Sequence, residues 1–81
     1  MPSLFVLATP ENRPVVEVAE RDADVSVHRS GPYFVLASAE GFSIDRRATG
    51  CRHAVWYSCV AGLSGFRIEG WDKDSLRLAV R

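Results

Sequence analysis

The nine residues from Cys51 to Cys59, CRHAVWYSC, contain both cysteines of the chain, one of its two histidines and one of its two tryptophans. In extended backbone, Cys51 and His53 share a face with their Cα atoms about 6.6 Å apart, and the neighbouring arginines favour a thiolate. A cysteine nucleophile with a histidine base is therefore one interpretation, which makes the protein a small enzyme or ligand-binding barrel using Cys51 and His53.

Cross-linking and metal binding are the other chemistries that these residues suggest. The Cα atoms of Cys51 and Cys59 would lie about 26 Å apart in a strand or about 12 Å apart in a helix. A disulfide needs about 7 Å or less, so we expect none. His28 could complete a four-ligand zinc set, but a second closely spaced ligand pair is missing. No glycine-rich phosphate-binding sequence occurs either, and we expect neither a metal nor a cofactor.

Arginines and aromatic residues gather around the same segment. These residue types are favoured at the centres of protein interfaces, and they also line grooves that bind single-stranded nucleic acids. The formal net charge of zero favours the first interpretation, because nucleic-acid-binding domains are usually basic. We predict a non-catalytic interaction module, a regulator, inhibitor or subunit, that binds another protein through Arg46, Arg47, Arg52, His53 and Tyr57. The alternative is a nucleic-acid-binding module using Arg46, Arg47 and Arg52.

Length and composition bound the architecture. The 81 residues are enough for one hydrophobic core, so we expect a single domain over residues 1–81. A hydrophobic content of 47% is too high for intrinsic disorder. The sequence has no signal-peptide core or membrane span, which predicts a cytoplasmic protein without a membrane partner. Residues 1–45 are acidic and residues 46–81 are basic, and we expect the fold to interleave these charges.

Short apolar or alternating runs separated by turn residues indicate strands. We expect strands at residues 4–8, 15–20, 25–28, 33–37 and 42–45, and a hairpin over the last sixteen residues. Residues 52–61 fit a strand or a helix; their β-branched and aromatic content favours the strand. Trp56 and Cys59 should be core, with Cys51, Arg52 and His53 at an exposed start.

The predicted fold is all-β, a small two-sheet sandwich or barrel of about seven short, mostly antiparallel strands. An α+β fold with one helix at about residues 52–61 on an antiparallel sheet is the alternative. Apolar strands with both faces to cover also suggest a homodimer.

Overall fold

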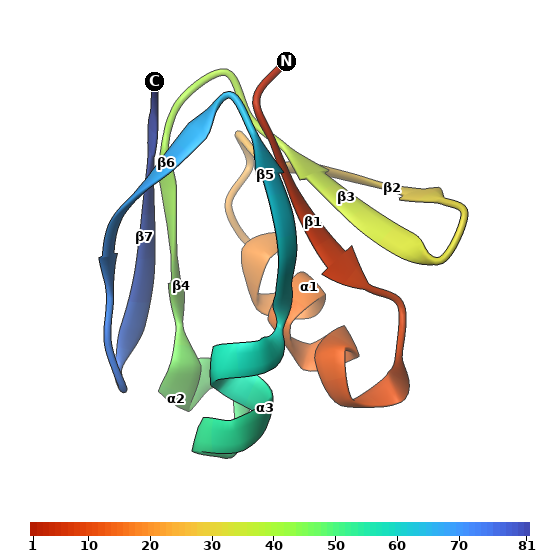
Figure 1. Ribbon diagram of the computed structural model, residues 1–81, viewed down its shortest axis with the longest axis vertical. Coiled ribbons are helices and arrows are strands. Elements are labelled where there is room, and N and C mark those ends of the chain that lie inside the picture. Colours follow the sequence, from red (N-terminus) through yellow and green to blue (C-terminus); the bar gives the residue numbers. More distant parts are fainter.

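A computed structural model describes residues 1–81, and in it seven short strands form two antiparallel sheets (Figure 1). Sheet A has the order β2-β3-β1-β5, and sheet B has the order β4-β7-β6. The prediction of a small two-sheet fold with about seven mostly antiparallel strands is confirmed. The strands of sheet A are β1 (Ser3–Leu7), β2 (Ser26–Ser30), β3 (Tyr33–Ala37) and β5 (Val60–Ser64). The strands of sheet B are β4 (Phe42–Asp45), β6 (Phe66–Trp71) and β7 (Ser75–Val80).

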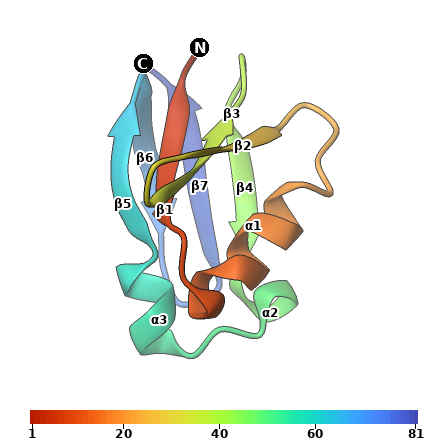
Figure 2. The same cartoon turned by 90° about the vertical axis from the view of Figure 1, so that its right-hand side faces the viewer.

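Short helices occupy two of the connections. The 3₁₀ helix η1 (Pro10–Asn12) and helix α1 (Arg13–Ala19) connect β1 to β2. Helices α2 (Arg46–Thr49) and α3 (His53–Ser58) connect β4 of sheet B to β5 of sheet A. All of them lie at the end of the molecule opposite the two chain termini (Figures 1 and 2). None of the helices is long and apolar enough to cross a membrane.

The core lies between the inner faces of the two sheets and is closed by the helices. Sheet A contributes Leu4, Val6 and Leu36, and sheet B contributes Ile44 and Leu76, all without solvent exposure. Two rings of sheet B, from the strands on either side of β7, meet edge to face within the core, with 5.5 Å between the ring centroids of Phe42 and Phe66. The helices add Val15, Val16, Ala19 and the fully buried Trp56 to the same cluster.

The two sheets present different outer faces to solvent. We call the outward-pointing residues of the four paired strands "the outer face of sheet A": Ser3, Phe5, Leu7, Ser26, His28, Ser30, Tyr33, Val35, Ala37, Gly62 and Ser64. The corresponding face of sheet B carries charges from each of its strands, among them Asp45, Arg67 and Arg77.

Two segments differ from their predicted structure. Val15 to Glu20, predicted as a strand, lies mostly in helix α1, because Pro14 is tolerated in a first helical turn and Val15, Val16 and Ala19 then point into the core together. In residues 52–61 the favoured strand is wrong and the alternative is right for residues 53–58, which form α3. The chain then enters β5 at Val60, a strand that the sequence pattern did not indicate.

Candidate functional site

The segment that connects β4 to α3 is a tightly capped turn. The Asp45 side chain accepts a hydrogen bond from the backbone N–H of Arg47 at 3.1 Å and so caps the start of α2. Gly50, with φ of 71°, ends the helix in the left-handed conformation that glycine adopts without strain. The Thr49 hydroxyl accepts a hydrogen bond from the Cys51 N–H at 3.1 Å. These local bonds fix where the two arginines of α2 project.

The guanidinium group of Arg46 donates hydrogen bonds to backbone carbonyls of the protein itself. Its Nε donates to the carbonyl of Lys73, and its Nη1 donates to the carbonyl of Cys51 at 3.1 Å. The backbone N–H of Arg46 also donates to the carbonyl of Asp74, at 2.9 Å. Arg46 therefore joins α2 to the turn between β6 and β7, and a role for it in binding stays a prediction.

The other four predicted binding residues are exposed. Arg47 makes one ion pair, 3.7 Å from Asp74, and its own side chain is largely in solvent whereas that of Asp74 is about half exposed. His53 and Tyr57 are four residues apart on α3 and so share one face of that helix. The Tyr57 ring, about half exposed, packs on Trp71 with 5.7 Å between the ring centroids. Arg52 stands at the N-cap position of α3.

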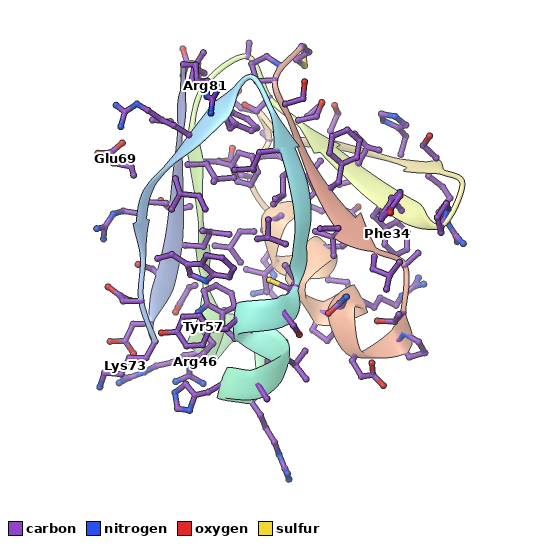
Figure 3. All side chains as sticks on the ribbon, viewed as in Figure 1. Phe34, Arg46, Tyr57, Glu69, Lys73 and Arg81 are labelled. Carbon is purple, nitrogen blue, oxygen red and sulfur yellow. The ribbon has the colours of Figure 1, made fainter.

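The turn between β6 and β7 places a further cation, Lys73, near α2 and α3. Figure 3 shows Arg46, Tyr57 and Lys73 beside one another at the helical end of the molecule. We call Arg47, Arg52, His53, Tyr57 and Lys73 "the α2–α3 surface". Lys73 was missed from sequence because its only signal was a turn motif more than fifteen residues away from the other members.

A buried anchor holds the α2–α3 surface in place. The indole Nε1 of Trp56 donates to the carbonyl of Asp72 at 2.7 Å, which ties α3 to the same turn that Arg46 contacts. Within the turn, the backbone N–H groups of Asp74 and Ser75 donate to the Asp72 carboxylate and hold its pKa below the ordinary value. Two independent ties therefore fix the turn against the helices, so the surface is ordered before any partner arrives.

The thiols point into the molecule. Cys51, expected at an exposed start of the segment, is buried, with its Sγ 3.9 Å from the carbonyl oxygen of Glu11, whereas His53 is exposed. Cys59 is buried as predicted, and both thiols are free. Burial, with a smaller contribution from Cys51, raises the pKa of Cys59 from 9.0 to about 11. The sulfur chemistry suggested by CRHAVWYSC therefore lacks an exposed thiolate.

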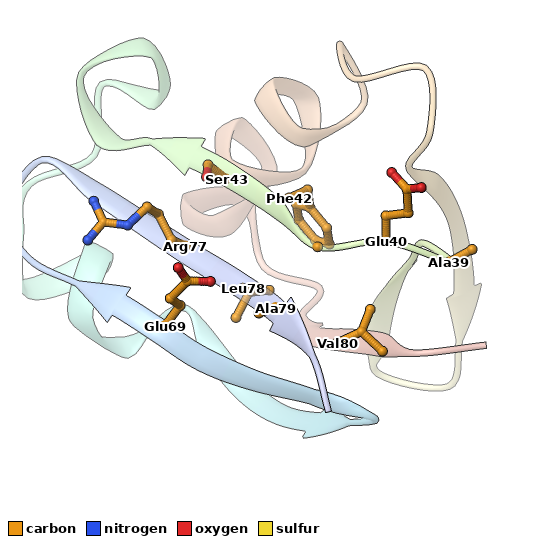
Figure 4. A pocket seen from close by; sticks show the side chains of 10 residues that line it. Ala39, Glu40, Phe42, Ser43, Glu69, Arg77, Leu78, Ala79 and Val80 are labelled. Carbon is orange, nitrogen blue, oxygen red and sulfur yellow. The ribbon is translucent and has the colours of Figure 1, made fainter.

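A shallow hollow of about 630 Å³ lies on the outer side of sheet B (Figure 4). Gly41, Ser43 and Ala79 are among its small lining residues, and Glu69 and Arg77 stand side by side at one end of it. The Arg77 guanidinium lies against Gly70, where an added Cβ would be 2.9 Å from its Cζ. This hollow, lined by both polar and apolar residues, is a second surface feature that the sequence did not indicate, because it depends on the pairing of three separate strands.

Comparison with known proteins shows the fold. No protein-family model and no curated protein sequence matches the chain. Among solved structures, it is similar to a chain in a phenol hydroxylase–regulatory protein complex, with a TM-score of 0.78 and 14% sequence identity. The match covers 99% of this chain and 98% of that chain. The likeness therefore extends over both sheets and all the helices described above.

Proposed function

We propose that this chain is a small, non-catalytic regulatory protein that acts by binding an enzyme. The observation that carries the proposal is the fold shared over nearly the full length of both chains with a member of an enzyme–regulatory protein complex. By analogy, a hydroxylase is the first class of enzyme to test. The proposal needs no reactive group on this chain, in keeping with its buried thiols.

The α2–α3 surface is the proposed contact region. It combines exposed cations with a half-exposed tyrosine that packs on Trp71, and arginine and tyrosine are enriched among residues that dominate binding energy. Because Trp56 and Arg46 already hold the surface in place, binding costs little additional ordering of the chain. The cations favour an enzyme surface that presents carboxylates.

The proposal is tested by affinity capture with the tagged chain from a lysate of the source organism, in the presence of nuclease, followed by binding to the purified partner. We expect one enzyme to be retained in stoichiometric amount and the Arg47→Glu variant to bind it at least tenfold more weakly. The exposed Arg67→Glu variant on sheet B is the matched control and should bind normally. Retention that depends on nucleic acid, or equal binding by Arg47→Glu, would contradict the proposal.

A further inference from the structure

We propose that the outer face of sheet A is a second docking surface and that it is covered by an uncharged, apolar area of the same enzyme. The inference rests on the proposed function, and it names a surface separate from the α2–α3 surface. It starts from the strand β1, whose residues alternate between the two sides of the sheet. Leu4 and Val6 point inward and have no exposure, so Phe5 and Leu7 point outward.

Aromatic and aliphatic side chains run across this face. The Phe5 ring packs edge to face against Tyr33 on the neighbouring strand, with 6.3 Å between the centroids. Leu7 lies directly opposite Tyr33 in the strand register. These last two side chains remain 43% and 37% exposed, respectively. The face thus leaves two large apolar side chains exposed at adjacent positions, whereas Val35 and Ala37 on the same face are buried.

The outer face of sheet A carries no Asp, Glu, Lys or Arg, in a chain of which 25% of residues are charged. Its polar members are serines, His28 and the Tyr33 hydroxyl. Sheet B is an internal comparison, because its outer face bears Asp45, Arg67 and Arg77. A sheet face that is solvated on its own normally carries polar and charged residues, whereas charges are depleted at the centre of interfaces. The two faces differ in the way that an interface differs from a free surface.

The outer face of sheet A is nearly flat beside β5, because the side chains there are small or absent. Gly62 lies opposite Phe5, and a Cβ at Gly62 would be 3.8 Å from the Phe5 ring, so the ring extends over the bare glycine. Ser3 and Ser64, which also pair with each other, continue the face with small side chains. A flat, aromatic surface of this kind fits another apolar surface without deep pockets.

The size of the face selects the occupant. Four strands about 4.8 Å apart, with five residues each rising about 3.3 Å, make a face with a planar area of roughly 300 Å². Two copies packed face to face would cover roughly 600 Å² of planar area, about half of the ~1,200 Å² of accessible surface that a specific and stable interface buries. A second copy of this chain is therefore too small an occupant. The molecule measures only 29 × 27 × 21 Å, so a large enzyme can contact this face and the α2–α3 surface together and bury the required area.

The test places one negative charge on the face. Leu7→Glu changes a position that is 43% exposed in the free protein, so the new carboxylate can stay hydrated until the partner binds. The matched control is Ile68→Glu, at an equally exposed position on β6 of sheet B. Binding to the purified enzyme is measured by titration calorimetry. We expect Leu7→Glu to weaken binding at least tenfold, because a carboxylate buried against an apolar area loses its hydration, and Ile68→Glu to bind as the wild type does.

The outcomes separate this inference from the proposed function. If the wild-type chain retains no enzyme, the proposed function fails. If the wild type binds and Leu7→Glu binds equally well, the docking face is wrong and the proposed function stands. Sedimentation velocity of the free chain tests whether a second copy covers the face instead. A wild-type dimer that the Leu7→Glu substitution dissociates would overturn the inference in favour of a second copy. Should Leu7→Glu fail to fold, Tyr33→Lys on the same face gives the same test.

Discussion

Arg46 and Arg47 are adjacent in sequence, but their guanidinium groups have different surroundings. Arg46 donates to two backbone carbonyls, whereas Arg47 makes a single ion pair through a side chain that is largely in solvent. We expect Arg46→Ala to lower the free energy of unfolding by about 1–2 kcal/mol, since the half-buried carbonyl contact of Cys51 and the exposed carbonyl of Lys73 lose a charged donor. Arg47→Ala should change it by less than about 0.5 kcal/mol. Urea denaturation measures both, and equal losses for the two variants would contradict the role of Arg46.

Cys59 makes stability depend on pH in the alkaline range. Its thiol has a pKa of about 11 in the folded protein, against 9.0 ordinarily, because it is buried. Between these values the unfolded chain loses the thiol proton while the folded chain retains it, so the free energy of unfolding falls as the pH rises from about 9 to about 11. Below pH 9 both states are protonated and the thiol has no effect on the pH dependence.

The control for this pH dependence is Cys59→Ala, which removes the titrating group and leaves other alkaline titrations in place. Denaturation midpoints measured from pH 8 to 11 should fall more steeply for the wild type than for the variant. Parallel curves for the two proteins would show that the Cys59 thiol titrates alike in the folded and unfolded states.

At the scale of elements, the contact between β4 and β7 depends on a glycine. A Cβ at Gly41, just before β4, would lie 2.2 Å from the Leu78 carbonyl oxygen, and backbone atoms cannot move aside cheaply. Gly41→Ala should therefore destabilise the protein by about 2–3 kcal/mol through overpacking. Gly62→Ala in β5 is the control, since its Cβ would meet only the Phe5 ring at an ordinary 3.8 Å. Equal thermal midpoints for the two variants would contradict this packing.

The local sequence pattern predicted most strands. It failed for the segments in which packing against the core determines whether the chain forms a helix or a strand. Tyr33–Ala37 and Phe42–Asp45 form strands as predicted, and the final hairpin is present, because each has clear alternation or flanking turn residues. The valines of α1 have β propensity, yet their spacing also suits a helix face, and contact with the core selects the helix. The six residues of α3 are too few for helical periodicity to be recognised beside the apolar start of β5.

The candidate site was predicted in part. Arg47, Arg52, His53 and Tyr57 were proposed from residue type alone, and the structure places all four in solvent, on α2, on α3 or at the start of α3. The engagement of Arg46 by carbonyl groups and the presence of Lys73 depend on contacts between segments about 27 residues apart, which no local pattern encodes. The uncharged outer face of sheet A was also hidden, because it exists only once the strand register is known.

At the scale of the whole molecule, acidic and basic residues lie beside each other at both groups of helices. On α1, Arg13 pairs with Glu17 at 3.3 Å. Beside the cations of the α2–α3 surface, Asp45 caps α2 and Asp74 lies 3.7 Å from Arg47. Figure 2 shows α1 and α3 at the helical end of the molecule. We expect the exposed cations of α2 and α3 to be the charges that meet carboxylates of the partner.

The regulatory role is tested most directly by the turnover of the captured enzyme, measured with increasing amounts of the purified chain at low and physiological salt. We predict that the rate changes saturably, reaches its limit at a fixed ratio of chain to enzyme, and requires more Arg47→Glu than wild type for the same effect. A rate that stays constant at saturating chain, with binding demonstrated in the same sample, would contradict a regulatory role.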